Sequence, residues 1–103
     1  MLTAVVLAAL FQSAAINSQR DSYIDCLNQA VDSAKTQKMP AEALEAHLRL
    51  TCASVEASFE KVLIAFDLKN KVPRKQAAAD AQVQVDDFVT SKVDRYRMLA
   101  ANQ

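Results

Sequence analysis

The chain has 103 residues, with 12 basic and 12 acidic side chains, two prolines and no glycine. This length suffices for one domain. Without glycine, the chain cannot form glycine-dependent phosphate loops or Asn-Gly hairpins, and its balanced charge provides no general attraction to nucleic acid or an anionic membrane. The composition therefore favours an all-α protein.

An apolar leader opens the chain. Residues 1–15 contain no charged side chain, and residues 2–11 are almost wholly apolar. Ser13 and Ala15 place small side chains at the two positions that a signal peptidase reads, so cleavage is expected after Ala15. No basic residue precedes the apolar segment, and the alternative is an uncleaved start of a long helix. The segment is too short to span a bilayer, which needs about 20 apolar residues.

Three helices are predicted after the leader, joined by two short connections. The first covers about residues 18–37, the second begins at Pro40 and ends near residue 69 or 70, and the third runs from Pro73 to about residue 100. Their apolar faces are Tyr23, Leu27, Ala30 and Ala34; then Leu44, Leu48, Cys52, Val55, Phe59, Val62, Leu63 and Phe66; then Ala78, Ala81, Val85, Phe88, Val89, Val93, Tyr96 and Ala100. The predicted fold is an up-down-up three-helix bundle, an antiparallel hairpin plus a third helix, with residues 16–103 as a single domain.

Cys26 and Cys52 are equally far from Met39, where the first two helices are expected to meet. An antiparallel hairpin turning there brings both cysteines to one level, which predicts a disulfide between them. A metal site would need more ligands, and a redox pair usually has the spacing Cys-x-x-Cys. A disulfide and a leader together predict an exported protein, periplasmic or secreted.

The remaining polar residues form no recognisable reactive site. His47 is the only histidine, and it is expected at an edge or in solvent. Asp86 and Asp87 diverge by about 100° on a helix and are expected on a solvated face. The sequence therefore predicts no catalytic residue, no metal ligand and no cofactor.

The turn between the second and third helices is basic. It contains Lys69, Lys71, Arg74 and Lys75. A solvated loop is the favoured interpretation, and a site for an anion or a phospholipid headgroup is the alternative.

Two apolar surfaces are predicted on the second helix. Leu50, Ala57 and Ile64 form the centre of a second stripe, which is expected to be either an association face or an unusually broad intramolecular face. Removal of the leader would leave the first helix too short to cover the second helix beyond Val62. This predicts a shallow groove lined by Phe59, Val62, Leu63, Phe66, Ala78 and Ala81. The alternative is that Ile16 and the start of the first helix fold over it, or that the third helix bends to close it.

These features support two hypotheses about function above the others. The first is a non-catalytic interaction or structural module that associates with itself or with another envelope protein. The second is a binding or chaperone-like protein for an apolar or amphiphilic ligand. An enzyme is the weakest hypothesis because no reactive motif is present. No nucleic-acid partner is predicted, and no stable membrane span is predicted in the mature chain.

Overall fold

A computed structural model describes the backbone of residues 2–101 and the side chains of residues 14–101. The described chain is all-helical, which confirms the predicted fold class, and no strand occurs within it. Four helices follow one another: α1 (Leu2–Thr36), α2 (Ala41–Thr51), α3 (Ala53–Lys69) and α4 (Arg74–Ala101).

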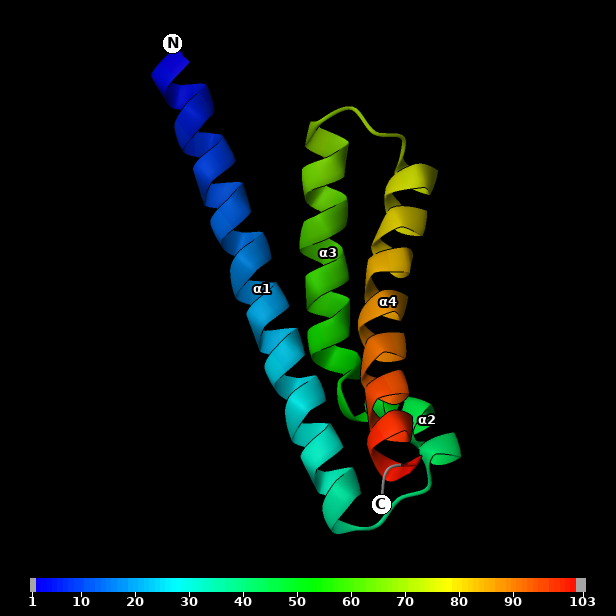
Figure 1. Ribbon diagram of the computed structural model, residues 1–103. Helices are drawn as coiled ribbons and strands as arrows, with labels where there is room; N and C mark the ends of the chain where they lie inside the picture. The colour runs from blue at the N-terminus through cyan, green and yellow to red at the C-terminus, as the bar shows by residue number, and fades with distance from the viewer. Residues whose placement is uncertain (1, 102–103) are drawn as a thin grey trace.

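The three long helices lie side by side, and each runs antiparallel to the one before it in the series α1, α3, α4 (Figure 1). The short helix α2 lies at the end of the bundle where α1 and α4 end, and it contacts both of them. Toward its N-terminus, α1 diverges from α3 (Figure 1).

The prediction of one helix from Pro40 to residue 69 or 70 is wrong, because the chain bends at Cys52. The backbone there has φ −105° and ψ 17°, and no side chain caps the start of α3. The Cys52 amide still donates to the Leu48 carbonyl at 3.0 Å, and the ladder resumes where the Glu56 amide donates to the Cys52 carbonyl at 2.9 Å. The bend has no local cause in glycine, proline or a capping side chain, so contacts with other helices must hold it.

Both connections between long segments use the same helix end. Lys38 and Lys71 adopt left-handed backbone conformations, with φ of 55° and 64°. After α1, the Met39 amide donates to the Ala34 carbonyl at 2.9 Å; after α3, the Val72 amide donates to the Asp67 carbonyl at 3.0 Å. These are the bonds of a Schellman motif, which usually places glycine at the left-handed position. A chain without glycine places a lysine there instead.

One core joins all four helices. Its buried members include the predicted residues of α1, two leucines of α2, Cys52 at the bend, and residues on successive turns of α3 and α4. They are Tyr23, Leu27, Ala30, Ala34, Leu44, Leu48, Cys52, Phe59, Leu63, Ala81, Val85, Val89, Val93 and Tyr96. On α4 the prediction is wrong at Ala78 and Ala100, which are exposed, whereas Ala77 is buried. No charged or polar side chain is fully buried among residues 14–101.

The backbone of α1 passes without interruption through the predicted cleavage position after Ala15. Met1 and the side chains of residues 2–13 lie outside the described part of the structure, so the leader and its removal stay predictions. Within the described residues, no helix has the length and apolarity needed to cross a membrane.

Candidate functional site

The polar cluster with the most ion pairs is centred on Arg49, in the last turn of α2. Its Nη2 atom is 3.0 Å from Asp86 Oδ1 on α4 and 3.2 Å from Glu45 Oε1 on α2, and its Nη1 atom is 4.0 Å from Glu56 Oε1 on α3. These are all the ion pairs that residues 14–101 form. The guanidinium therefore links α2 to α3 and α4 immediately before the bend.

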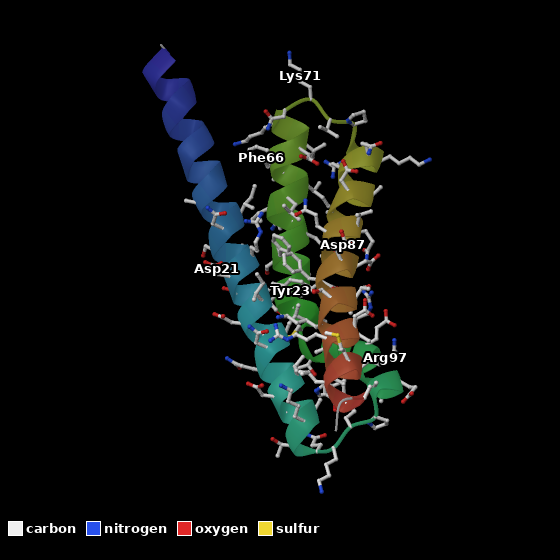
Figure 2. All side chains as sticks on the ribbon, in the orientation of Figure 1. Asp21, Tyr23, Phe66, Lys71, Asp87 and Arg97 are labelled. Carbon is white, nitrogen blue, oxygen red and sulfur yellow. A yellow bond between two sulfur atoms is a disulfide. The ribbon has the colours of Figure 1, made fainter. Side chains whose placement is uncertain are left out.

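A buried tyrosine extends this cluster to α1. Tyr23 is labelled in Figure 2. Its hydroxyl donates to Glu56 Oε1 at 3.3 Å, and its ring packs against Phe59 and Phe88 at centroid distances of 5.7 and 6.0 Å. Burial and the adjacent Glu56 carboxylate raise the pKa of the Tyr23 hydroxyl above its ordinary range. Tyr23 therefore stays protonated and serves as a hydrogen-bond donor at neutral pH.

The carboxylates of the cluster experience opposite environments. Hydrogen bonds from Gln82 and Arg49 lower the pKa of Asp86, although desolvation opposes them. Desolvation, together with the negative charges of Glu56 and Asp86, raises the pKa of Glu60. The predicted solvated face contains Asp87, which is exposed. The Asp86 side chain is also 45% exposed, but it is paired with Arg49, which the sequence did not predict.

This arrangement has the chemistry of a structural network. Its carboxylates already form ion pairs with the Arg49 guanidinium. Tyr23 is only 1% exposed, so its side chain is not accessible to a ligand in solvent. Residues 14–101 contain no group of three or more histidine, cysteine, aspartate or glutamate side chains that could hold a metal ion. Glu45 and Arg49 have the local i,i+4 spacing of a helical pair, but the links from Arg49 to Asp86 and from Tyr23 to Glu56 join residues that are far apart in the sequence. The network as a whole was therefore missed from the sequence.

The structure brings the two cysteines together as predicted. Cys26 on α1 and Cys52 at the α2–α3 bend lie at disulfide distance, with their Cα atoms 5.9 Å apart. Cys52 is 1% exposed and Cys26 is half-buried. A covalent link thus joins α1 to the residue at which the chain bends.

His47 connects α2 to α1. Its Nε2 atom is 3.1 Å from the Ala30 carbonyl oxygen, and the side chain is half-buried. The half-buried position agrees with the expectation that His47 lies at an edge. Its contact with the Ala30 carbonyl was not predicted from the sequence. Donation from Nε2 to a carbonyl requires a proton on that nitrogen.

The residues of the predicted groove do not form an open surface in the chain with α1 intact. Phe59, Leu63 and Ala81 are buried, while Val62 and Phe66 are half-buried and Ala78 is exposed. Ile16 packs against the core, which is the alternative foreseen from the sequence. Figure 2 shows Phe66 on the part of α3 that lies beside the diverging segment of α1. The groove stays a prediction for a chain that begins at Ile16.

The predicted association face is divided by the bend. Leu50 lies on α2 and is 80% exposed, whereas Ala57 and Ile64 lie on α3. Ala57 is exposed, but Ile64 packs against the core. The three residues therefore do not form one continuous helical stripe, and Leu50 is the member with the largest free apolar surface.

The two ends of the bundle differ in character. At one end, Lys69, Lys71, Arg74 and Lys75 are all exposed around the α3–α4 turn, where Figure 2 places Lys71. At the other end, a hollow of about 790 Å³ lies between the α1–α2 turn and the C-terminal part of α4. Sequence reasoning missed this hollow because it depends on how α2 brings the turn close to α4.

Comparison with known proteins identifies no relative: no family model, curated protein or solved structure matches this chain.

Proposed function

We propose that this protein is a small exported helical module that acts by binding another protein or a second copy of itself, without catalysis. The observation that carries the proposal is the Cys26–Cys52 pair at disulfide distance. Disulfides persist in oxidising compartments, and small exported domains use them to supplement a limited core. The apolar leader supports the same compartment, because residues 1–15 have the composition of an export signal.

Mass spectrometry and N-terminal sequencing of the protein from an oxidising compartment test the export proposal. The mature chain is expected to begin at Ile16, and its intact mass is expected to rise by about 2 Da on reduction because one disulfide gains two hydrogens. A mature product that still carries Met1, or one with two free thiols, would contradict the proposal.

The interaction role is supported by Leu50. An isolated exposed leucine is common, but this one lies one turn after the exposed Ala46 and three positions before the exposed Ala53. Small neighbours allow another helix to approach closely. The exposed apolar surface around the bend is therefore the proposed contact with a partner helix.

Replacing Leu50 with glutamate tests this contact, because the side chain is 80% exposed and the substitution leaves the core intact. A self-associating wild type is expected to become monomeric in light scattering, with unchanged helicity. Val83→Glu is the matched control, since Val83 is 57% exposed on a different helix, α4. A wild type that is already monomeric at high concentration rules out the homodimer, and equal loss in both variants rules out Leu50 as the contact.

A further inference from the structure

The hollow at the end of the bundle lies where the turn after α1 meets the last turns of α4 (Figure 1). Its volume of about 790 Å³ is within the range of small-molecule sites, which is about 300–1,000 Å³. It is lined by Lys35, Lys38, Met39, Pro40, Ala41, Tyr96, Leu99 and Ala100.

The floor and walls of the hollow are mainly apolar. The Tyr96 hydroxyl donates to the Met39 carbonyl oxygen, so these two polar groups are already hydrogen-bonded. Tyr96 and Met39 therefore contribute mainly the aromatic ring and the methionine side chain to the lining of the hollow. Leu99 contributes further apolar surface and is 43% exposed. An apolar chain placed here would cover surface that is now in contact with water, which is favourable by the hydrophobic effect.

The charged residues of the hollow all have the same sign. Lys35 and Lys38 are exposed at its edge, and no acidic side chain is among its lining residues. Every ion pair formed by residues 14–101 involves Arg49, which lies near the bend and not at this hollow. The two ammonium groups are thus available to a ligand whose charged end is negative.

We infer that this hollow binds a free medium-chain fatty acid. The carboxylate lies between Lys35 and Lys38, and the hydrocarbon chain lies over Met39 and Leu99. A single negative charge on an apolar chain complements a pair of cations beside an apolar floor. The hollow and the N-terminus lie at opposite ends of the bundle (Figure 1), so this binding does not depend on whether the leader is removed.

Calorimetric titration of the oxidised protein tests the assignment with two probes, decanoate below its micelle concentration and the neutral alcohol 1-decanol. The double variant Lys35→Gln/Lys38→Gln is expected to weaken decanoate binding by about 3- to 30-fold while leaving decanol binding unchanged, because only decanoate uses the two partly screened charges. Lys69→Gln/Lys71→Gln is the matched control, since it removes two exposed lysines at the opposite end of the bundle and should change neither affinity.

The apolar part of the site is tested separately. Leu99→Gln is expected to weaken both probes, whereas Met98→Gln, the substitution of a 61% exposed neighbour that does not line the hollow, should weaken neither. Circular dichroism confirms that each variant remains folded.

The assignment would be overturned by the absence of saturable decanoate binding, or by an equal decanoate affinity in wild type and Lys35→Gln/Lys38→Gln. It would also be overturned if Lys69→Gln/Lys71→Gln weakened decanoate binding as much as Lys35→Gln/Lys38→Gln does. Tighter binding of a zwitterionic lysophospholipid than of decanoate would overturn the free acid as the ligand. None of these results bears on the association of Leu50, which light scattering reports independently.

Discussion

Arg49 is the residue at which the polar contacts of three helices converge. It is one-third exposed, so each of its ion pairs is screened by solvent and contributes modestly to the free energy of folding. Arg49 contributes to stability through the number of its ion pairs, because this one side chain contacts carboxylates on α2, α3 and α4. Without it, those carboxylates and Glu60 would remain close to one another without a cation.

Arg49→Met is expected to lower the free energy of unfolding by about 1–2 kcal/mol, through the loss of three partly exposed ion pairs and the repulsion left behind. Urea denaturation at neutral pH measures the change. Arg97→Met is the control, because Arg97 is exposed on α4 and belongs to none of the ion pairs described (Figure 2). Equal effects of the two substitutions would show that the cluster adds nothing to stability.

At the scale of single elements, the helices could be predicted but the bend could not. Pro40 and Pro73 precede α2 and α4, and apolar spacing correctly identified most of the buried faces. The bend at Cys52 interrupts a pattern that continues on both sides of it. Beside the bend, α2 packs against α4, and Arg49 reaches Asp86, a residue 37 positions away. Local sequence patterns do not reveal contacts between residues so far apart in the chain.

The conformation of two helix ends could not be predicted from the sequence either. The absence of glycine correctly indicated helices, yet α1 and α3 both finish in a helix end for which glycine is preferred. A left-handed conformation costs a non-glycine residue about 1 kcal/mol, so Lys38 and Lys71 are retained at some expense in stability.

Lys71→Gly is therefore expected to raise the free energy of unfolding by about 0.5–1 kcal/mol, because glycine adopts a positive φ without steric cost. Lys69→Gly, two residues earlier in the last turn of α3, is expected to lower it by a similar amount because glycine weakens a helix. Thermal denaturation of the two variants should show shifts of opposite sign, and shifts of the same sign would exclude the conformational explanation.

For the molecule as a whole, the disulfide sets the register of α1 against α3. The pairing of Cys26 with Cys52 places Arg20 over the Phe59 ring, with 5.9 Å from its guanidinium carbon to the ring centroid. This register was predictable because the two cysteines fix it, regardless of whether α2 and α3 are straight. The Arg49 cluster and the hollow were not predictable, because both depend on the direction in which α2 turns.

Opening the disulfide is expected to lower the free energy of unfolding by about 3–4 kcal/mol, the chain-entropy value for a loop of this size. The melting temperature should fall by roughly 15–25 °C. The variant Cys26→Ala/Cys52→Ala avoids placing a hydroxyl at Cys52, which is 1% exposed, and should retain most of the helicity. A melting temperature equal to that of the oxidised wild type would show that the bond does not stabilise the fold.

The position of the disulfide also determines how the protein transmits force. A load applied between the two ends of the chain passes from Cys26 directly to Cys52, so the intervening turn and α2 are not stretched. Because the cysteines are 26 positions apart, the shielded segment would otherwise contribute about 80–90 Å of contour length. Single-molecule extension of the oxidised protein should therefore end about 80–90 Å shorter than extension of the reduced protein, and the helix that carries Arg49 should bear no tension.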